Sequence, residues 1–249
     1  MGSNIKRREE IINLIKESLE KNLYDNISAC FVYGSSLRED FNKLSDYDFL
    51  LILNKADEKT LTKLRRIRKN LINKLKVNID INVQLDDEMP NSRGKLFWHN
   101  NRGFIVQIEL QKYAKLLIGE SPFKDTHINQ IDIQIEAIKV IDSFVYQTRK
   151  IIISRDLNVL DRISIIKFCI YATYYSLAFK NVFPEERANS FNEFRKYFRT
   201  RCNPILFFNL KKNRYKNITN KDLALAYNFL LELDHILFKE FIYKEAKHV

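Results

Sequence analysis

The most informative stretch of this chain, residues 32–52, reads VYGSSLREDFNKLSDYDFLLI. An apolar run ends in a Gly-Ser pair at Gly34, and a second apolar run opens ten residues later with Asp46 and Asp48. Side chains alternate faces along a strand, so both aspartates point the same way while Tyr47 points into the core. Neighbouring carboxylates repel each other, and a bound cation offsets that repulsion.

The Gly-Ser turn is suited to a phosphate group. Glycine lets backbone N–H groups approach a ligand closely, and the positive end of a helix starting there attracts an anion. We therefore assign Gly34, Ser35, Ser36 and Arg38 as candidate nucleotide-binding residues, with Ser35 as the favoured phosphate contact. The alternatives are a turn or cap role for the serines and a solvated helix position for Arg38. Together with the aspartates, the turn predicts a site for a metal-bound nucleoside triphosphate.

A third carboxylate fits the same site. Residues 77–84 alternate cleanly between apolar and polar, which predicts a half-buried strand with Asp80 on its polar face. A helix from Lys55 to Lys76 connects the two strands, with one apolar side formed by Leu61, Leu64, Ile67, Leu71 and Leu75. A strand–helix–strand unit can bring Asp80 beside Asp46 and Asp48, giving three oxygen ligands for one or two Mg²⁺ ions.

These motifs resemble those of the DNA polymerase β nucleotidyltransferase superfamily, in its small bacterial form. The shared pattern is Tyr33-Gly34-Ser35, a gap of ten residues, Asp46-Tyr47-Asp48, and later Asp80 between two isoleucines. Small members often read Gly-Ser-x-Ala-Arg-Gly in the first element. This chain keeps the arginine but has Leu37 and Glu39 at the alanine and second glycine positions.

The resemblance implies a Mg²⁺-dependent transfer of a nucleoside monophosphate from a triphosphate, expected to be ATP, to an acceptor hydroxyl. Gly34 and Ser35 would hold the β and γ phosphates. Asp46 and Asp48 would bind two Mg²⁺ ions, and Asp80 would bind the second ion and help to deprotonate the attacking hydroxyl. The implied fold is an α/β (α+β) N-terminal domain with a mixed sheet and an all-α C-terminal bundle.

The domain boundary is expected at the Gly119–Pro122 turn, giving a nucleotidyltransferase domain at residues 1–125 and a helical domain at 126–249. Ahead of it we predict a helix over 5–24, strands over 27–33 and 114–118, and a helix over 102–111. Beyond it we predict helices over 131–153, 160–180, 184–198 and 222–245, with the second central because it is apolar nearly all round.

The net charge of +11 bears on the acceptor. It suits an RNA acceptor such as a tRNA end better than the polycationic aminoglycoside antibiotics that other family members modify. Residues 195–221 carry nine basic side chains and no acid, interleaved with aromatics. Either the basic residues hold phosphates while the aromatics stack on bases, or the aromatics belong to the core and the basic residues form a solvated face. A non-catalytic nucleotide-binding partner, such as an antitoxin, is the third alternative.

No signal peptide or transmembrane helix is expected from the sequence. The three cysteines lack metal-ligand spacing, and Cys30 and Cys169 lie in apolar runs. Buried thiols in a reducing cytoplasm are therefore expected.

Overall fold

The computed structural model describes residues 2–37, 41, 46–89, 103–123, 128–153, 157–184 and 190–245. The chain divides into two compact units. The first comprises residues 1–100 and 106–127, and the second comprises residues 101–105 and 128–249. Each unit is described below by itself.

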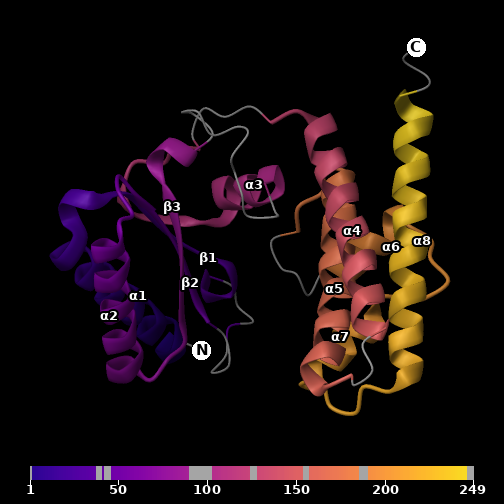
Figure 1. Ribbon diagram of the computed structural model, residues 1–249, viewed down its shortest axis with the longest axis horizontal. Helices are drawn as coiled ribbons and strands as arrows, with labels where there is room; N and C mark the ends of the chain where they lie inside the picture. Colours follow the sequence, from indigo (N-terminus) through magenta and orange to yellow (C-terminus); the bar gives the residue numbers. More distant parts are fainter. Residues whose placement is uncertain are drawn as a thin grey trace. The chain divides into compact units, whose positions relative to one another are not determined.

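The first unit is built on a mixed four-stranded sheet, as expected (Figure 1). The strands are β1 (Ile27–Tyr33), β2 (Tyr47–Leu53), β3 (Ile79–Leu85) and β4 (Lys115–Gly119), in the order β3-β2-β1-β4. β2 and β3 are parallel, whereas β1 is antiparallel to both β2 and β4. The parallel pair follows from the intervening helix, because a parallel connection needs a crossover.

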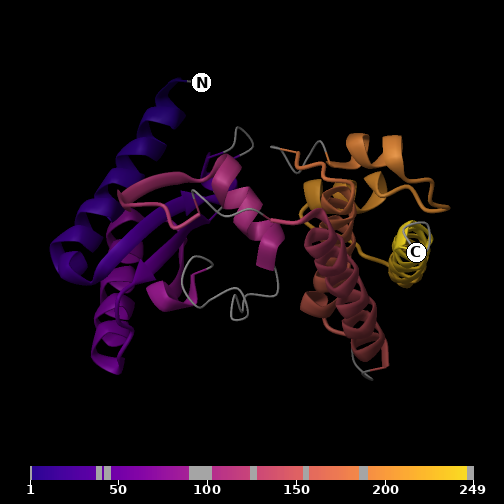
Figure 2. The same cartoon turned by 90° about the horizontal axis from the view of Figure 1, so that it is seen from above.

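Two helices, α1 (Gly2–Leu23) and α2 (Glu58–Leu75), lie side by side on one face of the sheet (Figures 1 and 2). α3 (Gly103–Tyr113) contributes Leu110 to a smaller core on the other face. Short 3₁₀ turns lie at Tyr24–Asn26, Gly34–Leu37 and Asp86–Glu88. The predicted apolar side of α2 is buried at Leu64, Ile67 and Leu71. Leu61 belongs to the same predicted side but is 44% exposed.

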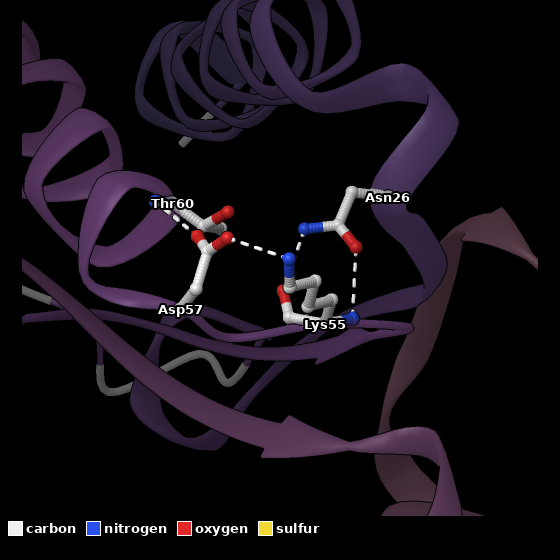
Figure 3. A network of polar contacts seen from close by, with 4 residues as sticks. All are labelled: Asn26, Lys55, Asp57 and Thr60. Carbon is white, nitrogen blue, oxygen red and sulfur yellow. Dashed lines mark hydrogen bonds and ion pairs between the residues drawn. The ribbon is translucent and has the colours of Figure 1, made fainter.

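A polar network joins the end of β2 to the start of α2 (Figure 3). The Asn26 side chain donates to the Lys55 carbonyl at 2.7 Å and accepts from the Lys55 N–H at 2.8 Å. Lys55 Nζ lies 2.9 Å from Asp57, whose other carboxylate oxygen accepts the Thr60 N–H at 2.8 Å as the N-cap of α2. The network therefore fixes where α2 begins.

Asp57→Ala is expected to lower the melting temperature by a few degrees at pH 7, and by less in acid. The hydrogen bonds from Lys55 and Thr60 hold the pKa of Asp57 below its ordinary value. A lowered folded-state pKa gives stability that is present above about pH 4 and is lost as the pH falls toward the folded-state pKa. Thermal melts of both proteins between pH 2 and 7 check this, and a difference independent of pH would contradict it.

The second unit is a helical bundle in which α4 (Gln130–Ile153), α5 (Val159–Phe179) and α8 (Asn220–Glu245) pack together. α5 is buried on nearly all sides from Ile165 onward, which confirms its predicted central place. The smaller helices are α6 (Ser190–Tyr197) and α7 (Ile205–Lys212). Pro184 is not helical, so it does not begin the predicted helix, and residues 185–189 lie outside the described residues. α7 was not predicted.

All three cysteines are free thiols, and Cys30 and Cys169 are buried as predicted. Burial raises the pKa of the Cys30 thiol to about 12, which removes its nucleophilic form at neutral pH. Among the described helices, none combines the length and apolar character needed to cross a bilayer.

The start of α3 is capped by Glu136 of α4. Its carboxyl oxygens accept the N–H groups of Phe104 at 2.5 Å and Ile105 at 3.4 Å. Burial raises the pKa of Glu136 to about 8, although these hydrogen bonds and Lys139 act in the opposite direction. The folded protein therefore holds a proton here that the unfolded chain releases near pH 4.3.

Glu136→Gln is expected to gain thermal stability relative to the parent as the pH rises from about 4.5 to 8. In that range the unfolded parent binds fewer protons than the folded parent, so the parent's stability falls with pH. Glutamine keeps an oxygen acceptor for the cap but does not titrate. Melting temperatures measured at half-unit pH steps check this, and parallel curves for the two proteins would contradict it.

Candidate functional site

The sheet brings two of the three predicted acidic residues into direct register. Asp48 of β2 is paired with Asp80 of β3 on one side and with Tyr33 of β1 on the other. Adjacent strands lie about 4.8 Å apart, so the two aspartates occupy neighbouring positions. By strand alternation both lie on the face opposite α1 and α2, because Tyr47, Phe49 and Ile79 belong to the core beneath those helices.

Asp46 immediately precedes β2 and is exposed. Its carbonyl oxygen accepts the Ser35 hydroxyl at 3.3 Å, so the Gly-Ser turn is tied to the entry of β2. The next residue, Tyr47, is 3% exposed and donates its N–H to Asn78 of the chain leading into β3 at 2.9 Å. Asp46 therefore lies at a fixed strand entry, two residues from Asp48, with its side chain open to solvent.

Gly34 brings the backbone against the acidic residues. It adopts a left-handed conformation (φ +73°), and a Cβ atom at this position would lie 2.5 Å from Oδ2 of Asp48. A residue with a side chain would therefore strain the turn and displace the carboxylate. This close approach of a glycine turn and a carboxylate matches a site that holds both a phosphate and a cation.

The other turn residues differ in their surroundings. Ser36 is fully buried, and its hydroxyl donates to the Tyr33 carbonyl at 2.9 Å, so its hydroxyl is engaged within the turn. Ser35 is only half-buried, which leaves its backbone and side chain near the surface of the turn. Arg38 lies outside the described residues.

A polar pair beside the acidic residues was not predicted as part of the site. Asn82 of β3 donates its side-chain N–H to the Tyr33 hydroxyl at 2.8 Å, across β2. Asn82 is two residues beyond Asp80, so the alternation of the strand already places it on the same face. Its hydrogen bond to Tyr33 could not be predicted from the sequence, because a contact between residues 49 positions apart depends on the order of the strands.

The acidic residues suit a hard cation whose remaining ligands come from water and the substrate. Within the described part of the chain, no group of three His, Cys, Asp or Glu side chains is gathered closely enough to hold a metal. Mg²⁺ is usually bound through one or two carboxylates together with water and substrate phosphates. Asp48 and Asp80, at neighbouring positions beside the Gly34 turn, fit that mode of binding.

The basic segment of residues 195–221 is organised differently from a base-stacking surface. Phe194, Phe198 and Phe207 are buried, and the rings of Phe194 and Phe207 lie 5.9 Å and 5.3 Å from Phe229 of α8. Its basic side chains are exposed. With Phe194, which directly precedes the segment, six aromatics accompany these basic residues: Phe194, Tyr197, Phe198, Phe207, Phe208 and Tyr215. Three of the six belong to the core, which favours the solvated-face alternative.

Two comparisons with known proteins show what this chain is similar to. The family described as Polymerase beta, Nucleotidyltransferase matches residues 13–101, which include β1, β2, β3 and all three aspartates. Among solved structures, the chain is similar to spectinomycin adenyltransferase AAD(9) from Enterococcus faecialis, crystallised with ATP and spectinomycin. The identity is 15% and the TM-score 0.60, over 91% of this chain and 99% of that one. No curated protein matches the sequence. The chain therefore carries a DNA polymerase β-type nucleotidyltransferase domain, and it is a nucleotidyltransferase.

Proposed function

We propose that this enzyme transfers AMP from ATP to an acceptor hydroxyl in a Mg²⁺-dependent reaction. The observation that carries the proposal is the register of Asp48 and Asp80 on adjacent parallel strands, with the Gly34 turn against Asp48. The adenine base is supported by the structural neighbour, which was crystallised with ATP. The proposal therefore assigns Asp46, Asp48 and Asp80 to catalysis and the Gly34 turn to the triphosphate.

In the proposed reaction, the acceptor oxygen forms a bond to the α-phosphorus while the bond from that phosphorus to the pyrophosphate oxygen breaks. The acceptor proton passes to the Asp80 carboxylate, and pyrophosphate leaves. Asp46, Asp48 and Asp80 would hold Mg²⁺, which when bound neutralises the developing charge and positions both oxygens. Backbone N–H groups at Gly34 and Ser35 donate to the β and γ phosphates and orient the triphosphate for in-line attack.

Two observations bear on the acceptor, and they point to different classes. The likeness to AAD(9) extends over the helical unit as well as the nucleotidyltransferase domain, which supports a small hydroxylated acceptor. The net charge of +11 supports RNA, but the burial of Phe194, Phe198 and Phe207 removes part of the stacking surface that would serve it. A small molecule is therefore the second candidate for the acceptor beside RNA, and the likeness to AAD(9) favours it.

One label-transfer experiment tests the reaction, the base and the acceptor class together. The purified protein is incubated with Mg²⁺ and each α-labelled nucleoside triphosphate, with total tRNA in one set of tubes and a panel of aminoglycoside and aminocyclitol antibiotics in another. Label from ATP should appear in one acceptor class, with one pyrophosphate released per transfer, and EDTA should abolish it. Tight ATP binding without turnover in either set would instead favour the non-catalytic nucleotide-binding alternative.

A further inference from the structure

A basic groove lies between α1 and α2. These two helices cover the sheet face away from the aspartates (Figure 2). Its volume is about 710 Å³. On α2 the lining residues recur at helical spacing from Lys63 to Lys74, and on α1 they recur from Leu14 to Asn22. At 1.5 Å per residue the α2 side is about 16 Å long, so the groove is an elongated channel.

The groove is lined by four cations and one acid. The cations are Lys21 of α1 and Lys63, Arg66 and Lys74 of α2, and the acid is Glu17. Lys63 donates to the Asn22 carbonyl and so links the two helices. Lys21, Arg66 and Lys74 are exposed, and within the described chain none of these three forms an ion pair. Three positive charges therefore face the groove without an acidic partner.

α2 as a whole is strongly basic. The helix carries seven basic residues and one acid, a net charge of 7 − 1 = +6 out of +11 for the chain. Several of these cations are three or four residues apart, such as Lys63 with Arg66, which both line the groove. Like charges at these spacings repel and destabilise a helix. A polyanion bound along the groove would relieve that repulsion.

We propose that the α1–α2 groove binds the phosphate backbone of a single-stranded nucleic acid. A line of cations along an elongated channel complements a line of phosphates, and asparagines Asn22 and Asn70 add donors between the charges. No aromatic side chain lines the groove, so binding is expected to depend on phosphate contacts and not on base sequence. The bound strand need not be the acceptor of the transfer reaction.

The test compares two triple variants with the same change in charge. The groove variant carries Lys21→Gln, Arg66→Gln and Lys74→Gln, and leaves Lys63 in place because it links the helices. The control carries Lys212→Gln, Lys216→Gln and Lys221→Gln, which are exposed residues of the other basic segment. The probe is a fluorescein-labelled U20 RNA, and its anisotropy gives the affinity between 50 and 200 mM salt.

The parent should bind U20 with an affinity that falls steeply with salt. Each lost phosphate contact lowers the slope of log K against log salt by about 0.7 for a single strand, so the groove variant should lose about 2 from the slope. It should also bind about tenfold more weakly at 50 mM salt, while the control keeps the parent's values. The single variant Arg66→Gln should lose about 0.7 from the slope, which keeps the test valid if the triple variant folds poorly.

Three results would overturn the proposal. These are no binding of U20 by the parent, an unchanged slope in the groove variant, or a loss in the control as large as in the groove variant. Vesicles containing phosphatidylserine and a poly-glutamate chain serve as rival polyanions in the same assay. Tighter binding to either of them than to RNA would reassign the groove to a membrane surface or an acidic protein.

Discussion

Asp48→Asn and Asp80→Asn are each expected to lower the rate of nucleotidyl transfer at least about a hundredfold, with the fold unchanged. The amide keeps the size of the side chain but removes the charge that would hold Mg²⁺. Asp80 is exposed and Asp48 only half-buried, and neither residue belongs to the core on either face of the sheet, so packing should not change. Without metal the melting temperature should hold or rise slightly, because a repulsion between like charges is removed.

Asp87→Asn is the matched control. Asp87 is an exposed aspartate just beyond β3, in the 3₁₀ turn at the far end of the strand from Asp80, and its substitution removes the same charge. Initial rates with Mg-ATP and the acceptor identified by label transfer should be close to the parent's for this variant. An unchanged rate in Asp80→Asn would remove Asp80 from the site and require another residue in its place.

The architecture of the first unit could be predicted because each signal was local. The alternation around Asp80 and the Asp46–Asp48 spacing each predict which side chains face the core. Tyr47, Phe49 and Ile79 are buried as predicted, although β2 is buried on both faces beyond Asp48. The crossover helix between them makes the pair parallel, which puts Asp48 opposite Asp80. The acidic part of the site therefore follows from two strands and one connection.

What could not be predicted depends on contacts between distant residues. Leu61 follows the apolar spacing of α2 but is exposed, because spacing gives the direction of a side chain and not whether a packing partner is present. The Asn82–Tyr33 hydrogen bond can be predicted only if the order of the strands is known. α7 was obscured by the basic residues around it, although its Phe207 is fully buried. The groove between α1 and α2 depends in the same way on the packing of two helices.

Gly34→Val is expected to weaken Mg-ATP binding at least about tenfold with little loss of helical content. At φ +73° a β-branched residue is strained, and its Cβ would lie 2.5 Å from Oδ2 of Asp48. Relief of that contact moves either the turn away from the phosphates or Asp48 away from its position opposite Asp80. The left-handed conformation alone costs about 1–2 kcal/mol, which corresponds to a fall of several degrees in Tm. Calorimetric titration with Mg-ATP and circular dichroism measure the two effects.

Gly119→Ala is the control that separates the effect of backbone strain from the loss of the nucleotide-binding turn. Gly119 has the same φ of +73°, and its added Cβ would lie 1.9 Å from the Ser28 carbonyl oxygen, a harder contact with rigid backbone. It pairs with Ala29 near the start of β1, whereas Gly34 follows the end of that strand. Gly119→Ala should therefore lose more thermal stability than Gly34→Ala and yet keep the parent's affinity for Mg-ATP below its melting temperature. Normal affinity in both Gly34 variants would contradict the assignment of this turn to the triphosphate, because the close approach that only glycine permits would then serve the fold alone.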